Sequence, residues 1–334
     1  MYYKFIFYNS LIMGTMVAIS SYSWMGMWMG LEINLLSIIP LMGSTDNMMA
    51  SEASMKYFIT QALASTILLF SIITLSLNFM YNMSMILYFS LMLNTALLIK
   101  MGAAPFHFWF PEVMMGMSWI NSTIMLTWQK IAPMILIIYS NKTLIYLSLS
   151  IISCMLVSGI MGNNQTYLPK IMAYSSINHI GWMLASLMFM ESIWLFYFII
   201  YSIITLNITL IFKILNIFHL SQLFLSMNNN FMVKLFFILN FLSLSGMPPF
   251  LGFLPKWLTI QTMVNYNLMS LTFIMIISTL MTIFFYIQIT YSTMILQMNE
   301  INFTISIKNS FLLMTLNLIS LSGLIFMTVM FNFT

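Results

Sequence analysis

The sequence consists of long apolar runs separated by short polar connectors. The runs are continuous and do not show the alternation of a membrane-barrel strand. A run of about 20 apolar residues is long enough to cross a bilayer as a helix. Because 61% of the residues are hydrophobic and only 5% are charged, the chain lacks the charged surface of a water-soluble domain. The pattern predicts an all-α polytopic membrane protein.

Hydropathy and turn signals predict about eleven transmembrane helices within a single integral membrane domain, residues 1–334. The predicted spans are residues 4–20, 23–42, 53–78, 84–118, 121–140, 143–162, 168–190, 192–216, 232–264, 268–293 and 309–331. The connectors are too short for an extramembrane domain. No glycine-rich phosphate loop and no cluster of Cys and His at metal-ligand spacing occurs, so we expect neither a cofactor site nor a metal site in this chain.

Two of the apolar runs contain the same motif. GAAPFHFWFPE at 102–112 aligns without a gap with GMPPFLGFLPK at 246–256. Proline removes a backbone donor, so both runs are predicted to be interrupted helices. Freed backbone groups are tolerated at membrane depth only in protein or against a wet cavity, and paired interruptions point to a transport site. The predicted helix-breaking residues are Gly102, Pro105, Gly246, Pro248 and Pro249.

The position of the motifs predicts two repeats, residues 1–140 and 143–293, with a helix at 309–331 left over. Each repeat holds five predicted spans, an odd number, so the second repeat inserts upside down relative to the first. Most lysines near span ends fall on the N-terminal side, which by the positive-inside rule faces the cytoplasm-equivalent compartment. The lysines are scattered and arginine is absent, which argues against nucleic acid as a partner.

Four charged residues are predicted near the centre of the membrane. They are Glu32, Lys100, Lys130 and Lys256. Each costs roughly 2.5 to 3.5 kcal/mol on an insertion scale, which favours a function over drift. Lysine suits proton transfer because a moving neighbouring charge changes its protonation. The alternative is that the four groups form static ion pairs that hold helices together.

Other polar residues in the spans allow two interpretations. His107 and His179 can relay protons near neutral pH, or they can be hydrogen-bonded packing residues. Lys56 and Glu112 lie either within the membrane or within reach of its surface. Cys154 is the only cysteine, and we interpret it as a helix-packing residue. The tryptophans near span ends and breaks, among them Trp109, are expected to anchor helices at the interface.

Several longer stretches resemble the mitochondrially encoded chain 2 family of NADH:ubiquinone oxidoreductase, respiratory complex I, with the character of an insect sequence. The stretches are GLEINLLSIIP at 30–40, EASMKYFITQALAS at 52–65, KMGAAPFHFWFPE at 100–112, NQTYLPKIMAYSSINHIGWM at 164–183 and LSLSGMPPFLGFLPKW at 242–257. The resemblance covers essentially the whole chain. It implies an antiporter-like subunit with two inverted five-helix repeats, located in the mitochondrial inner membrane with its N-terminus in the matrix and its C-terminus in the intermembrane space.

The resemblance also implies roles and partners. Glu32 matches the family's membrane glutamate, Lys100 and Lys256 match lysines on the two broken helices, and Lys130 matches the connecting lysine. His179 matches a position on the central axis. FMN, iron–sulfur clusters and ubiquinone then belong to partner subunits, and the partners are other membrane-arm subunits and phospholipids such as cardiolipin. We predict that Lys130 lies between Lys100 and Lys256 at mid-depth.

Three functions remain open at this point. The chain is a proton-translocating subunit of a redox-driven pump, or mainly a scaffold whose charges are static struts, or a stand-alone cation/proton antiporter. Lysines connected by water would favour the pump, and dry, fully paired lysines would favour the scaffold.

Overall fold

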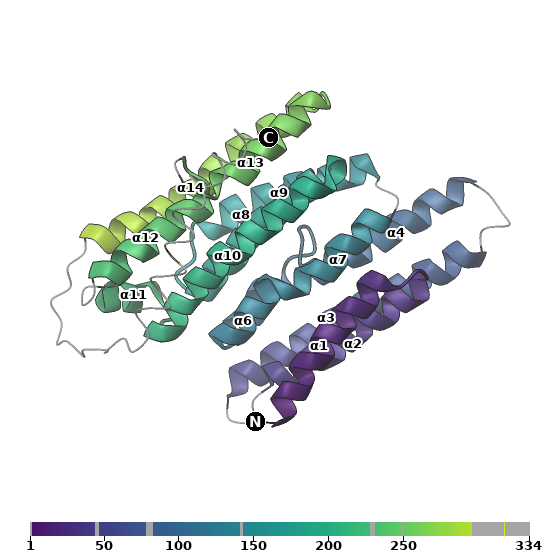
Figure 1. Cartoon of the computed structure of the whole chain (residues 1–334), viewed down its shortest axis with the longest axis horizontal. Helices are drawn as coiled ribbons and strands as arrows, with labels where there is room; N and C mark the ends of the chain where they lie inside the picture. The colour runs from purple at the N-terminus through teal and green to yellow at the C-terminus, as the bar shows by residue number, and fades with distance from the viewer. Residues whose placement is uncertain are drawn as a thin grey trace, which may run out of the picture. The chain divides into compact units, whose positions relative to one another are not determined.

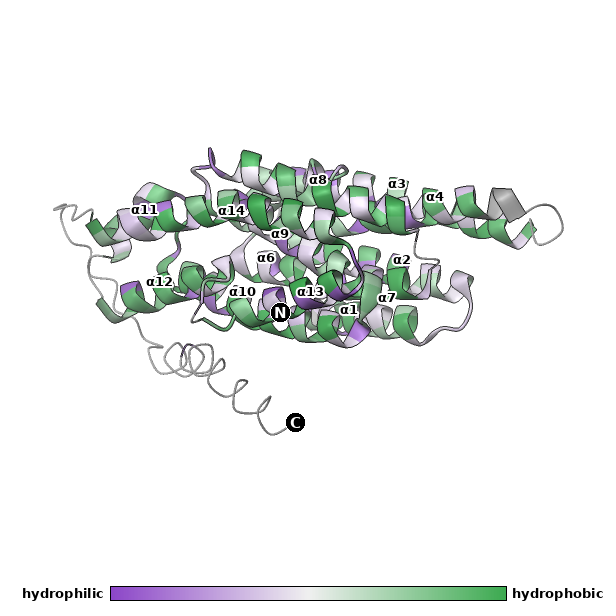
Figure 2. Cartoon of the chain, turned by 90° about the horizontal axis from the view of Figure 1, so that it is seen from above, coloured by the Kyte–Doolittle hydropathy of each residue, from purple (hydrophilic) through white to green (hydrophobic). Residues whose placement is uncertain are grey.

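The computed structural model describes residues 2–43, 47–77, 83–140, 143–227, 231–248, 250–295 and 317. Within these residues the regular elements are α-helices, apart from one isolated bridge between Tyr167 and His219. Six of the described helices are long and apolar enough to cross a membrane, and Figure 2 shows hydrophobic residues along the helices. The all-α membrane class is therefore confirmed. Pro249 and the predicted span 309–331, apart from Asn317, lie outside the described residues, so the number of spans stays a prediction.

The chain divides into two compact units, Met1–Cys154 and Met155–Thr334, and the division falls inside α8 (Leu144–Gly162). The predicted repeat boundaries at 140 and 143, and the inverted relation of the repeats, stay predictions. The helices of the first unit are α1 (Tyr2–Ser20), α2 (Trp24–Met42), α3 (Met48–Leu77), α4 (Met83–Met101), α5 (Trp109–Met115), α6 (Trp119–Leu126) and α7 (Trp128–Tyr139).

The first unit is built from neighbouring helices that pack in chain order. α2 packs on α1 and α3, α3 packs on α4, and α4 packs on α7 (Figure 1). α2 begins at Trp24 because the Ser23 hydroxyl accepts a hydrogen bond from the Gly26 amide, which satisfies one of the unpaired donors of the first turn. The packing brings α2, α3, α4 and α7 together around the end of α4.

The second unit is organised around one buried helix. Its helices are α9 (Leu168–Phe189), α10 (Glu191–Leu215), α11 (Leu220–Met227), α12 (Phe231–Ser245), α13 (Phe253–Asn265) and α14 (Met269–Ile295). α9 is buried on all sides from Ile171 to Met188 and is contacted by α10, α13 and α14. A helix without a polar face is the expected centre of such a bundle. Polar side chains on α9 must therefore find partners inside the protein.

The structure confirms both predicted interruptions and adds one that the sequence did not predict. Residues 84–118 form α4 and α5, and residues 232–264 form α12 and α13. The predicted span at 121–140 is found as the 21-residue apolar stretch Trp119–Tyr139, within which the turn residue Thr127 separates α6 from α7. The polar connector before residue 231 contains α11, whose start is capped by Gln222 accepting from the Phe218 and His219 amides.

Candidate functional site

The first break begins one residue after α4 ends. Gly102 has a φ of 71°, in the left-handed region that glycine adopts without steric cost. Its amide donates to the Ile99 carbonyl at 3.1 Å, and the Ala103 amide donates to the Leu98 carbonyl, also at 3.1 Å. This pair of bonds is the Schellman motif that closes a helix C-terminus. The break is therefore a capped helix C-terminus, and Lys100 lies in the last turn of α4.

Side chains from other helices satisfy the backbone groups that the break frees. The Ala104 amide donates to Cys154 Sγ at 3.2 Å, and the Ser153 hydroxyl donates to the Ala104 carbonyl at 2.9 Å. The Trp109 indole donates to the Ile99 carbonyl at 3.2 Å. Trp109 is thus buried at the break, and its expected role as an interface anchor stays a prediction. Cys154 packs inside the helix bundle as expected and also accepts a backbone hydrogen bond.

Replacing Cys154 with alanine is expected to destabilise the first unit. The substitution leaves the buried Ala104 N–H without an acceptor, which costs roughly 1 to 3 kcal/mol. The matched control on α8 is Ser158→Ala, since Ser158 is equally buried but bonds only within its own helix. The measurement is thermal inactivation of the assembled complex in its membrane. Equal stability of the two variants would show that the thiol contributes nothing to the break.

The structure places Glu32 near Lys100 without a direct ion pair. The charge of Glu32 acts on both Lys100 and Tyr57, yet the ion pairs found among the described residues do not include Glu32 or Lys100. Glu32 Oε1 is buried and has no hydrogen-bond partner in the described part of the chain. Lys100 is only 7% exposed. The two charges therefore interact through space, across a gap.

Lys130 lies beside the first break. It is 1% exposed and sits in the first turn of α7, directly after the interruption at Thr127. Its Nζ lies 5.8 Å from the centre of the Phe110 ring. The Phe110 side chain also packs against Gly102, where an added Cβ would lie 3.0 Å from Phe110 Cβ. The structure thus brings Lys130 to the same break that follows Lys100.

The second break has the same backbone geometry as the first. Gly246 has a φ of 78°, its amide donates to the Ser243 carbonyl at 3.0 Å, and the Met247 amide donates to the Leu242 carbonyl at 3.4 Å. These bonds form a second Schellman motif at the end of α12. Pro248 lies in the turn that follows, and Pro249 lies outside the described residues. The alignment of the two sequence motifs therefore corresponds to a repeated local structure.

Lys256 lies on α13, after the second break, and bonds to the end of α12, before it. It is 7% exposed, lies in the first turn of α13 and donates from Nζ to the Ser245 carbonyl at 2.6 Å. Ser245 is the last residue of α12, where a cation is favoured by the helix dipole. The ammonium also lies 5.9 Å from the centre of the Trp182 ring on α9. Lys256 thus bridges α12 and α13 across the interruption.

The two histidines occupy different environments. His107 lies within the first break, where Nδ1 is 3.3 Å from the Pro105 carbonyl and the ring packs on Phe108. His179 lies at the centre of α9, with Nδ1 2.9 Å from the Tyr197 hydroxyl and its ring 4.9 Å from that of Tyr201. Hydrogen-bonded packing accounts for both contacts. A relay role for either histidine stays a prediction.

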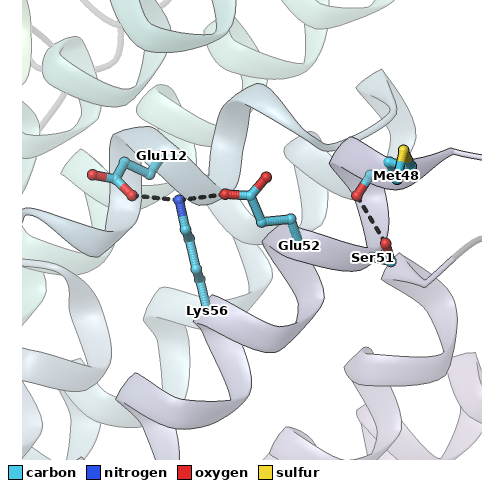
Figure 3. Close-up of polar contacts among 5 residues, drawn as sticks. All are labelled: Met48, Ser51, Glu52, Lys56 and Glu112. Carbon is cyan, nitrogen blue, oxygen red and sulfur yellow. Dashed lines mark hydrogen bonds and ion pairs between the residues drawn. The ribbon is translucent and has the colours of Figure 1, made fainter.

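Lys56 and Glu112 form an ion pair, and their depth in the membrane stays a prediction. The Lys56 ammonium lies 2.8 Å from Glu112 Oε2 and 2.8 Å from Glu52 Oε1, with both glutamate side chains more than half exposed (Figure 3). Glu112 occupies the position that aligns with Lys256 in the repeated motif. One position therefore carries an exposed paired acid in the first copy and a buried lysine in the second.

Sequence reasoning missed the uncharged polar residues that surround these charges. In the second unit, Asn178 donates to Thr282 at 3.2 Å, and the buried Tyr197 hydroxyl contacts His179. In the first unit, Gln129 donates to Asn34 at 2.9 Å, and Gln61 donates to the Lys100 carbonyl at 3.5 Å. The sequence did contain a signal for these residues, since Asn and Gln side chains within strongly apolar runs need hydrogen-bond partners inside the protein.

Comparisons with known proteins agree with this arrangement. The family described as NADH:quinone oxidoreductase/Mrp antiporter, transmembrane, matches residues 21–282. NADH-ubiquinone oxidoreductase chain 2 of Anopheles gambiae is 48% identical over 337 residues, which cover 98% of this chain and 97% of the relative. The protein of the same name from Aedes aegypti is 49% identical over 333 residues, with the same coverage.

A solved structure shares the fold. A chain of respiratory complex I from Thermus thermophilus with bound aureothin superimposes with a TM-score of 0.86 at 20% identity, over 97% of this chain and 78% of that chain. Buried lysines at interrupted helices, a family match over most of the sequence and near-full-length relatives therefore lead to one conclusion. The chain belongs to the NADH:quinone oxidoreductase/Mrp antiporter transmembrane family.

Proposed function

We propose that this chain transfers protons in the membrane arm of respiratory complex I, with Lys100, Lys130 and Lys256 as its proton-binding groups. As a member of its family it is an antiporter-like membrane subunit, and its relatives are named NADH-ubiquinone oxidoreductase chain 2. NADH oxidation and ubiquinone reduction take place in partner subunits, which hold FMN and the iron–sulfur clusters. This chain contributes the membrane path for the proton.

One observation carries the proposal. Each of the three lysines is at most 7% exposed, and each lies within one turn of a helix interruption. A buried ammonium group at membrane depth costs roughly 2.5 to 3.5 kcal/mol, and an interruption supplies backbone dipoles that can stabilise it. Neither Lys100 nor Lys256 takes part in the ion pairs found among the described residues. Groups of this kind can gain and lose a proton without breaking a salt bridge.

The proposal includes a location and partners. We place the N-terminus in the matrix and the C-terminus in the intermembrane space, because lysines near span ends are concentrated on the N-terminal side. The partners are neighbouring antiporter-like and small membrane subunits. Phospholipids such as cardiolipin would cover the apolar helix surfaces that remain, and the exposed apolar residues along α3 are consistent with such contacts.

A scaffold function is the second candidate, and one contact favours it. Lys256 donates a short hydrogen bond to the last carbonyl of α12, which is the geometry of a strut between two helix segments. A stand-alone cation/proton antiporter is a third candidate. It predicts sodium-dependent proton exchange by this chain in vesicles without its partner subunits.

Substituting Lys130 with methionine separates the pump from the scaffold. We expect complex I with Lys130→Met to assemble, since the substitution removes a buried charge and keeps the side-chain length. Proton transfer through this chain should fall by about 100-fold or more, as expected for loss of a proton-transferring group. The measurement is the number of protons moved per electron in sealed vesicles. The exposed lysine at the end of α10 supplies the control, Lys213→Met. A native proton-to-electron ratio in the Lys130 variant would support the scaffold.

A further inference from the structure

A small polar cavity lies beside Lys100 in the first unit. Its volume is about 10 Å³, and its polar lining comes from Asn34 on α2, Tyr57 and Gln61 on α3, Lys100 on α4 and Gln129 on α7. A cavity needs about this volume to hold one water molecule, and the water needs two to four polar partners. The five polar residues exceed that requirement. The size and lining therefore match a site for a single water molecule.

Pro133 adds a backbone acceptor to this cavity. Proline has no N–H, so the carbonyl of Gln129, one turn earlier in α7, lacks the hydrogen bond it would receive in an uninterrupted helix. Gln129 and Pro133 both line the cavity. The residue whose carbonyl loses its helical hydrogen bond is therefore one of the residues that line the cavity, and a freed carbonyl needs a donor.

Two amides fix the wall of the cavity. The Gln129 side chain donates to Asn34 Oδ1 at 2.9 Å, and the Gln61 side chain donates to the Lys100 carbonyl at 3.5 Å. The Lys100 ammonium carries three donors, and in the described part of the chain none of them forms a hydrogen bond or an ion pair with the protein. A buried ammonium group without an acceptor is costly. A residue with free donors, Lys100, and a residue with a freed acceptor, Gln129, therefore line the same water-sized space.

We propose that Gln129 is a positioning residue that holds one water molecule against Lys100. The water accepts a hydrogen bond from the Lys100 ammonium and donates one to the Gln129 carbonyl freed by Pro133. Asn34 fixes the Gln129 side chain and so sets the shape of the site. This inference rests on the proposed function for its consequence: the water takes the proton of Lys100 as hydronium, leaves a neutral amine, and returns the proton in the reverse step.

Pro133→Ala is the decisive variant. The alanine N–H can donate to the Gln129 carbonyl and so removes the acceptor that faces the water. A high-resolution map of the assembled complex should show one ordered water between Lys100 Nζ and the Gln129 carbonyl in the native protein and none in the variant. The matched control is Pro40→Ala in α2, which restores the same helical bond at Leu36, away from the cavity.

A second variant tests the amide wall. Gln129→Leu removes the bond to Asn34, and we expect loss of the ordered water together with a lower proton-to-electron ratio. Gln261→Leu, at an exposed position of α13, is its control. The inference is overturned if the native map resolves other buried waters but leaves this cavity empty, or if Pro133→Ala retains both the water and the native ratio. Either result leaves the proposed function standing, provided that Lys100→Met still abolishes pumping.

Discussion

Complex I that carries Lys100→Met is expected to assemble and to lose most of the proton transfer that this chain supports. Methionine fills nearly the same volume and removes a buried charge that costs roughly 2.5 to 3.5 kcal/mol at membrane depth, so stability should be unchanged or higher. Proton transfer should fall by about 100-fold or more, because no group at this position can then bind a proton. The measurement is the proton-to-electron ratio, taken together with the rate of quinone reduction.

The first unit supplies a matched control for this substitution. Lys56→Met also replaces a lysine, but the Lys56 side chain is 42% exposed and its ion pairs reach exposed glutamates. Exposed pairs contribute about 0 to 1 kcal/mol, so neither stability nor pumping should change measurably. If Lys100→Met and Lys56→Met both pump at the native ratio, Lys100 is a structural residue and the proposed mechanism fails.

Glu32 extends the same experiment. Its carboxylate acts on Lys100 through space, so Glu32→Gln and Lys100→Met should not be additive. Coupled residues show interaction energies of about 0.5 to 3 kcal/mol in double-substitution cycles. We expect Glu32→Gln to slow proton transfer in an otherwise native chain and to have no further effect when Lys100 is already methionine. Additive effects would mean that the two residues act independently.

The sequence predicted the helix breaks because the responsible residues carry the information themselves. Gly102 and Gly246 adopt the left-handed conformation that glycine favours, and the prolines that follow Gly102 and Gly246 cannot continue a helix. The interruption at Thr127 has no such signature. This interruption is a single turn residue without a glycine or proline beside it. Local chemistry therefore predicted two of the three interruptions.

The site was predictable in its charges but not in its contacts. A lysine within an apolar run is costly wherever it packs, so Lys100, Lys130 and Lys256 stood out from composition alone. Which groups surround each lysine depends on helix pairing that a single sequence does not determine. Among the described residues, the ion pairs do not include Glu32 or Lys100. The hydrogen bond between the Gln129 and Asn34 side chains could not be predicted, because it depends on the packing of α2 against α7.

Gly246→Ala is expected to displace Lys256 and to stop proton transfer through the second break. An alanine Cβ at this position would lie 2.7 Å from Lys256 Cδ and 2.8 Å from Nζ, closer than carbon and nitrogen atoms approach. The lysine side chain must then shift, and we expect the shift to weaken its 2.6 Å hydrogen bond to the Ser245 carbonyl. The left-handed backbone adds a strain of about 1 to 2 kcal/mol.

Gly102→Ala separates the backbone strain from the displaced lysine. Gly102 has nearly the same φ, 71° against 78°, but its Cβ would meet the Phe110 ring at 3.0 to 3.2 Å and would not touch Lys256. A second comparison is Gly246→Asn, because asparagine tolerates the left-handed conformation while its Cβ still meets the lysine. We expect Gly246→Ala and Gly246→Asn to lower the proton-to-electron ratio alike, and Gly102→Ala to lose stability with a smaller loss of pumping. If Gly246→Asn pumps normally, backbone strain alone explains the effect, and the position of Lys256 against the α12 carbonyl is not required for proton transfer.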